Sequence, residues 1–160
     1  MSFKSFIGAL CAVVLFSLPA RAVVMTLGAK APPLVAKSVG GAKVDLAKLK
    51  GKTVILYLWT TQCASCMKDL YTLRDFYNKY QDKGLAVIAL SADPPQLRYM
   101  VENVDALVDY PVVMASDAQQ NGYAMPGRFP LMYIITKDGK LHSFYSVMPK
   151  GQALLQAVFH

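Results

Sequence analysis

Two apolar segments of strand length, Thr53–Trp59 and Leu85–Leu90, lie on either side of a helical pattern and leave few folds open to this chain. Both segments are apolar on both faces after Thr53, which is typical of central strands covered on each side. Between them, apolar residues recur at steps of four and three from Cys66 to Tyr80. This pattern predicts an amphipathic helix of about sixteen residues that ends near Gly84. A strand, a helix and a strand in this order predict a βαβ unit within an α/β domain.

Shorter elements are predicted around this unit. Leu34–Ser38 and Ala42–Asp45 flank a Gly-Gly pair and predict a β-hairpin at the start of the domain. The other predicted elements are helices at Gln96–Val104 and Gly151–Phe159 and strands at Pro111–Ala115, Leu131–Thr136 and Leu141–Tyr145. The last two strands flank an Asp-Gly pair, the signal of a second hairpin. We therefore expect a central mixed β-sheet flanked by helices, with a parallel centre, an antiparallel edge and an N-terminal β-hairpin extension.

The first 22 residues predict a cleavable signal peptide. Phe6–Leu18 is an apolar run that follows one positive charge, and Ala20-Arg21-Ala22 has the small-x-small form of a signal-peptidase site. Because a membrane-spanning helix needs about 20 apolar residues, we expect cleavage after Ala22, with an uncleaved N-terminal anchor as the alternative. Residues 23–160 would then form one exported domain in the periplasm. Cys11 would be removed with the signal.

Composition and charge exclude several classes of protein. The chain has 160 residues, of which 54% are hydrophobic and 17% charged, so it can form one domain with a sizeable core and is not intrinsically disordered. The net charge of +7 is only mildly basic, so we expect no nucleic-acid partner. We also expect the protein to be a monomer. Lys43, Lys48, Lys50 and Lys52 form a basic stretch, which we interpret as a solvated face. Contact with an acidic partner or a membrane surface is the alternative.

The segment Cys63-Ala64-Ser65-Cys66 carries the chemistry. Cys63 comes just after a predicted buried strand and at the start of the predicted helix, where unpaired backbone N–H groups and the helix dipole stabilise a thiolate. Cys66 follows one helical turn later, close enough to resolve a mixed disulfide formed by Cys63. Half of a zinc site is the alternative, but only His142 and His160 remain as further ligands of the usual kind, at unsuitable spacings. We expect a redox pair with no metal and no cofactor.

The chain resembles the thioredoxin superfamily, and within it the exported thiol–disulfide oxidoreductases of the TlpA/ResA and cytochrome c maturation type. The resemblance extends from Leu27 to Phe159. It rests on the strand ending in Trp59, the Cys63–Cys66 pair, Asp69, the stretch Gly122–Pro130 and the turn at Asp138-Gly139. It implies a thioredoxin-like fold and a reductase of envelope protein disulfides, with apocytochrome c as one substrate and a membrane electron donor as a partner.

The same resemblance implies roles for single residues. Pro130 would be a cis-proline facing the cysteine pair, and Phe129 would offer backbone hydrogen bonds to an extended substrate segment. Trp59 would belong to the same substrate-binding set. Asp69 would be the catalytic acid–base group that helps Cys66 lose its proton, with an ordinary helix-surface aspartate as the alternative.

Three positions depart from the family pattern. Gln62 stands where these proteins commonly have a second tryptophan, and Tyr57 stands where thioredoxin has a buried aspartate. Ala64-Ser65 has neither the proline of reductases nor the histidine of strong oxidants. These differences leave the redox potential and the choice of substrate open.

Two other functions remain as alternatives. Thr60 lies three residues before Cys63, as in a thiol peroxidase, although Leu56 occupies the position where that class has a proline. Cys63, Cys66 and Met67 are soft ligands that would suit a cuprous-ion chaperone. No Met-rich or His-rich run supports the second alternative.

Overall fold

A five-stranded mixed sheet forms the centre of the computed structural model, which describes residues 25–123 and 125–159. The predicted signal peptide therefore lies outside the described residues. The strands, in their spatial order, are β5 (Val112–Met114), β4 (Leu85–Ser91), β3 (Thr53–Trp59), β7 (Leu131–Ile135) and β8 (Leu141–Tyr145). β3, β4 and β5 run parallel, whereas β7 and β8 pair antiparallel. The predicted parallel centre and antiparallel edge are confirmed.

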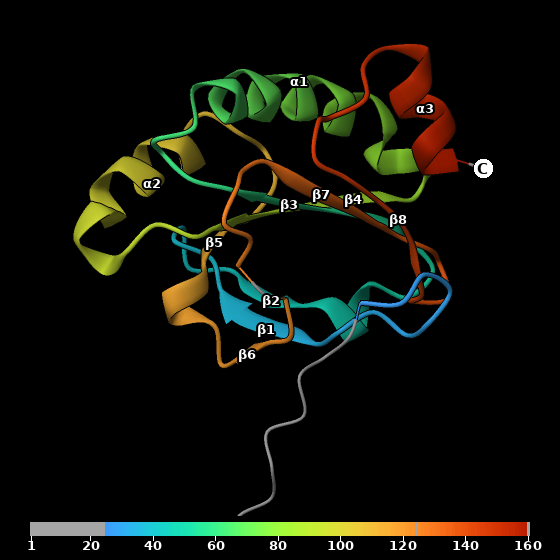
Figure 1. Cartoon of the computed structure of the whole chain (residues 1–160), viewed down its shortest axis with the longest axis horizontal. Helices are drawn as coiled ribbons and strands as arrows, with labels where there is room; N and C mark the ends of the chain where they lie inside the picture. The colour runs from blue at the N-terminus through green and yellow to red at the C-terminus, as the bar shows by residue number, and fades with distance from the viewer. Residues whose placement is uncertain (1–24, 124, 160) are drawn as a thin grey trace, which may run out of the picture.

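Helices and a second sheet cover the two faces of this central sheet (Figure 1). The helices α1 (Ala64–Tyr80) and α3 (Gln152–Phe159) lie on one face, and α2 (Arg98–Asp105) contacts β5 near the edge. The other face carries a small sheet of β2 (Lys43–Asp45), β1 (Leu34–Lys37) and β6 (Gln120–Asn121). Short 3₁₀ turns are η1 (Leu46–Leu49), η2 (Gln81–Lys83), η3 (Pro95–Leu97) and η4 (Ala115–Asp117).

The two faces of β3 explain its apolar sequence. Ile55, Tyr57 and Trp59 point into the core beneath the helices. Val54, Leu56 and Leu58 point into a second core beneath the small sheet. Because successive side chains of a strand alternate between faces, a strand with a core on each side needs apolar residues at every position.

The predicted hairpin is confirmed, since β1 and β2 pair antiparallel with Ala36 opposite Val44. The strand β6 was not predicted. It consists of Gln120 and Asn121, both exposed, and is held by backbone pairing with β1 rather than by an apolar pattern. Among the described residues, no helix is long and apolar enough to cross a membrane.

Candidate redox site

The helix α1 places Cys63 and Cys66 at its first turn. Cys63 is the N-cap residue, whose Sγ accepts a hydrogen bond from the backbone N–H of Cys66 at 3.2 Å. The two sulfurs form a disulfide of 2.02 Å. Cys63 is half-buried, whereas Cys66 has no exposed surface. Once the disulfide opens, another protein can therefore reach only Cys63.

The surroundings of Cys63 favour a thiolate. The first N–H groups of a helix have no partner within the helix, and here one of them points at Cys63 Sγ. The Ser65 hydroxyl lies 3.4 Å from the same sulfur. A negative charge on Cys63 would therefore be stabilised by groups already in position, as the sequence predicts.

An aspartate that the sequence analysis missed holds the loop before Cys63. Asp93 follows β4 and is nearly fully buried. Its carboxylate accepts hydrogen bonds from the backbone N–H and the hydroxyl of Thr61, at 2.9 and 2.8 Å, and from the Ser91 hydroxyl at 2.7 Å. Because the ends of parallel strands β3 and β4 meet at one edge of the sheet, an acidic residue just after β4 is the signal that could have found it.

Asp69 is buried beneath α1, with only 6% of its surface exposed. This burial does not fit the alternative of an ordinary helix-surface aspartate. Asp69 lies three residues after Cys66, and positions three apart on a helix share a face. Its carboxylate accepts a hydrogen bond of 3.0 Å from the Tyr57 hydroxyl, which comes from β3 and is fully buried.

The Tyr57 hydroxyl keeps its proton beside Asp69. Burial raises the pKa of Tyr57 far above its ordinary value, and the neighbouring Asp69 carboxylate raises it further. Tyr57 is therefore a permanent hydrogen-bond donor to Asp69. The sequence identified Tyr57 as a departure from the family pattern but did not connect it to Asp69.

Pro130 follows a cis peptide bond from Phe129. The strand β7 begins at the next residue, Leu131, which pairs with Leu58 at the end of β3. The cis bond therefore lies at the same end of the sheet as the loop that leads to Cys63. Phe129 is half-buried and packs against the same core as Cys63.

Trp59 has no exposed surface. Its side chain belongs to the core that also contains Cys66, and its indole N–H has no hydrogen-bond partner among the described residues. In this state the indole cannot touch a substrate, and contact would require the side chain to become exposed.

Metal ligands do not gather elsewhere in residues 25–123 and 125–159, where no group of three His, Cys, Asp or Glu side chains is close enough to hold an ion. The absence of a metal and of a cofactor stays a prediction.

Comparison with known proteins gives the family. Residues 27–144 match the AhpC/TSA family. A thiol-disulfide oxidoreductase ResA of Bacillus cereus is 34% identical over 119 residues, which cover 73% of this chain and 68% of the relative. ResA of Bacillus subtilis (strain 168) is 26% identical over 114 residues, covering 71% and 64%.

Solved structures with the same fold are also similar. A putative thiol:disulfide interchange protein DsbE from Chlorobium tepidum superposes with a TM-score of 0.69 at 22% identity, over 84% of this chain and 99% of the other. A putative protein disulfide isomerase from Bacteroides thetaiotaomicron gives a TM-score of 0.68 at 22% identity, over 84% and 87%. The chain thus belongs to the AhpC/TSA family of the thioredoxin-like fold, in which it is a thiol–disulfide oxidoreductase related to ResA.

Proposed function

We propose that this oxidoreductase is an exported reductase of protein disulfides. The observation that carries the proposal is the difference in exposure between Cys63 and Cys66. In the reduced enzyme, the Cys63 thiolate attacks one sulfur of a substrate disulfide, forms a mixed disulfide and expels the first substrate thiolate. The Cys66 thiolate then attacks Cys63 Sγ, which forms the disulfide present in this structure and releases the second substrate thiolate. Two electrons pass from the cysteine pair to the substrate.

Asp69 is the group that takes the proton from Cys66 before the second attack. Cys66 has no exposed surface, so bulk water cannot reach its thiol directly. The carboxylate of Asp69 is on the same face of α1 and is held by Tyr57. Geometry of this kind is suited to general base catalysis.

Phe129 and Pro130 bind the substrate beside Cys63. The support is their position at the end of β7, next to the end of β3 from which the redox loop starts. A half-buried Phe129 leaves part of this segment accessible to an extended chain. We assign Trp59 to the support of this site, because its side chain is buried in this state.

The periplasm is the compartment in which we place the reaction, and apocytochrome c is one substrate that the resemblance to TlpA/ResA proteins suggests. The predicted signal peptide supports export. Because the cysteine pair is oxidised after each turnover, a reductase there needs a steady source of electrons, and a membrane donor would supply it.

The reduction potential of the Cys63–Cys66 pair tests the direction of the reaction. Equilibration in glutathione or dithiothreitol buffers should give a value near or below about −250 mV. A value near about −120 mV, typical of a strong oxidant, would contradict the proposal.

Two cysteine variants test the order of attack. Cys63→Ser should abolish the acceleration of insulin reduction by dithiothreitol, and Cys66→Ser should trap a mixed disulfide between Cys63 and the substrate. Hydrogen peroxide with a thiol donor is the control for the peroxidase alternative, and rapid peroxide turnover that requires Cys63 would favour that function instead. A Cys63→Ser variant that still accelerates insulin reduction would exclude Cys63 as the nucleophile.

A further inference from the structure

The excess positive charge of this protein is concentrated at the start of the domain. Residues 25–52 contain six lysines and one aspartate, whereas residues 53–160 contain nine basic and nine acidic side chains. The six lysines, all exposed, are Lys30, Lys37, Lys43, Lys48, Lys50 and Lys52, and we call them the lysine face. The rest of the domain is thus neutral in formal charge, and the lysine face carries the whole excess.

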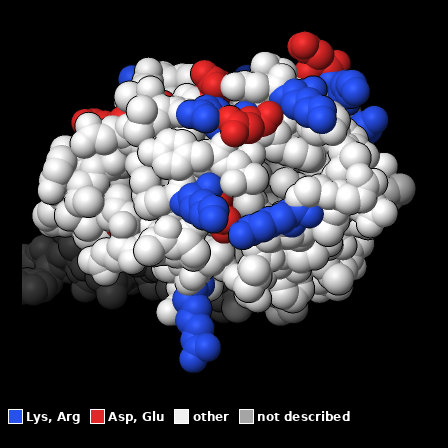
Figure 2. Space-filling model, turned by 90° about the horizontal axis from the view of Figure 1, so that it is seen from above, with Lys and Arg blue, Asp and Glu red and all other residues white. Residues whose placement is uncertain are grey.

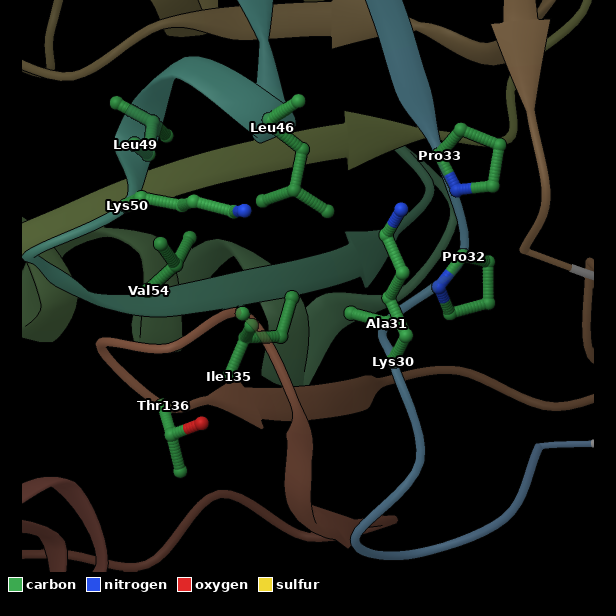
Figure 3. A pocket seen from close by; sticks show the side chains of 12 residues that line it. Lys30, Ala31, Pro32, Pro33, Leu46, Leu49, Lys50, Val54, Ile135 and Thr136 are labelled. Atoms are coloured by element: carbon green, nitrogen blue, oxygen red, sulfur yellow. The ribbon is translucent and has the colours of Figure 1, made fainter.

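The lysine face lies on the small sheet and around the turn η1, and Lys30 lies on the segment before β1. Lys37 and Lys43 are directly opposite each other in the β1–β2 pair, an arrangement that costs stability because like charges repel. Lys43, Lys48 and Lys52 line one groove of about 290 Å³ beside η1. Lys30 and Lys50 lie on a second cavity of about 460 Å³ (Figure 3). Leu49 lines both, so five of the six lysines surround η1.

No lysine of this face has an ion-pair partner among residues 25–123 and 125–159. Asp45, the one acid in the segment, accepts a hydrogen bond from the backbone N–H of Ala47 and caps η1. The ion pairs of the described chain join Arg74 to Asp75, Arg98 to Asp117 and Lys140 to Asp138. All three belong to the neutral part of the domain.

The opposite face has a different character. Seen from the side of α1 and α3, Lys and Arg side chains lie next to Asp and Glu side chains (Figure 2). Mixed charges of this kind give a weak net field, whereas six uncompensated lysines attract anions over about a Debye length, ~10 Å at 0.1 M salt.

We propose that the lysine face binds the surface of a bilayer that contains anionic lipids. Lysine is a compact, strongly hydrated point charge, which suits contact with a fluid layer of headgroups. A protein interface would instead be enriched in aromatic residues and arginine and depleted of lysine. The lysine face holds no arginine, and of the large apolar side chains most exposed in the described chain only Leu27 belongs to residues 25–52.

The position of the lysine face in the fold agrees with this partner. The small sheet and α1 lie on opposite faces of the central sheet (Figure 1). A bilayer bound to the lysine face would therefore leave the helix that carries Cys63 and Cys66 free to meet protein substrates and an electron donor.

Vesicle sedimentation tests the proposal with the full chain at 0.1 M salt. The vesicles contain either phosphatidylcholine alone or phosphatidylcholine with about 30% phosphatidylglycerol. Each lysine near an anionic surface strengthens binding about five-fold, so the triple variant Lys43→Gln, Lys48→Gln, Lys52→Gln should bind the anionic vesicles roughly 100-fold more weakly.

The matched control is the triple variant Lys79→Gln, Lys83→Gln, Lys150→Gln. It removes the same charge from exposed positions in α1, in η2 and just before α3, none of which belongs to the lysine face, and it should weaken binding far less than the lysine-face variant does. All three proteins retain residues 1–160, so any binding through the apolar run is common to them and is measured on the zwitterionic vesicles. Insulin reduction should be the same in all three.

Several results would overturn the proposal. Equal losses in both triple variants would mean that net charge alone drives binding. Equal binding of the unmodified protein to zwitterionic and anionic vesicles would exclude a role for anionic headgroups. Binding to polyglutamate through Lys43, Lys48 and Lys52, without any preference for anionic vesicles, would assign the lysine face to an acidic protein.

Discussion

Replacing Tyr57 by phenylalanine removes one hydroxyl and little else. The ring of Tyr57 is fully buried, and phenylalanine fills the same space, so no large cavity forms. What is lost is the hydrogen bond of 3.0 Å to the Asp69 carboxylate. The carboxylate, itself 6% exposed, would be left with one fewer donor in a place that water barely reaches.

The size of the effect follows from the charge of the acceptor. A hydrogen bond to a charged group contributes about 1.5–3 kcal/mol, so Tyr57→Phe should lower the free energy of unfolding by about 2 kcal/mol when Asp69 is ionised. The same hydrogen bond holds the carboxylate in place beneath Cys66. Because each 1.36 kcal/mol lost from a transition state slows a step ten-fold, the step that uses Asp69 should slow by up to about 30-fold.

A single-turnover reaction with an aromatic disulfide measures the two thiols separately. The first aromatic thiolate appears when Cys63 attacks, and the second appears when Cys66 resolves the mixed disulfide. In Tyr57→Phe, the second phase should slow by up to about 30-fold, whereas the rate of the first phase should stay unchanged.

Tyr110→Phe is the matched control for this experiment. Tyr110 is also buried in the same core, and its hydroxyl donates a hydrogen bond of 2.8 Å to the backbone carbonyl of Leu70 in α1. Tyr110→Phe should lose about 1 kcal/mol of stability without slowing either phase. The reasoning fails if both variants slow the second phase equally, or if Tyr57→Phe lowers stability and leaves the rate of the second phase unchanged.

Three further variants test the framework around the site. Asp93→Ala removes the acceptor for Thr61, so it should lower the free energy of unfolding by about 3 kcal/mol in urea titration and slow insulin reduction in a turbidity assay. An unchanged rate of insulin reduction would show that the loop before Cys63 keeps its conformation without Asp93. Gly122→Ala would place Cβ 2.5 Å from Pro32 Cβ and should lower stability by about 1–3 kcal/mol in thermal unfolding, unless the two segments separate freely. Burial raises the pKa of Asp105, so the folded state loses stability as the pH rises from the unfolded-state pKa to the folded-state pKa. Relative to the natural chain, Asp105→Asn should therefore be more stabilising at pH 7 than at pH 4. A difference in unfolding free energy that does not change with pH would contradict this.

The sequence predicted those helices and strands in which apolar residues follow a clear period. β3 lies at Thr53–Trp59 in both the prediction and the structure, because a strand between two cores must be apolar at every position. The helix after it starts two residues earlier than its first apolar position, since Cys63 itself caps the helix. β6 shows no apolar pattern in the sequence, because its two residues are exposed and are held only by backbone hydrogen bonds to β1.

The contacts that complete the site depend on distant residues and were not predictable from spacing. Asp93 meets Thr61 across 32 positions, and Tyr57 meets Asp69 across a strand and a helix. The fold brings these residues together only after β3 and β4 have paired and α1 has packed on them. The cis isomer at Pro130, which the family resemblance implied and the structure shows, had no local signal of its own, because a proline permits both isomers.

The two cysteines need different means of activation, and the fold separates them. Cys63 lies at the N-terminal end of α1, where backbone N–H groups, which every residue except proline supplies, favour its thiolate. Cys66 is inside the helix and fully buried, so its proton needs an acceptor made of side chains. Substitutions at Ala64 and Ser65 should therefore alter the first attack while leaving the second intact, whereas changes at Tyr57 should do the reverse. The step in which Cys66 resolves the mixed disulfide could thus be slowed without altering Cys63, the nucleophile that selects the substrate.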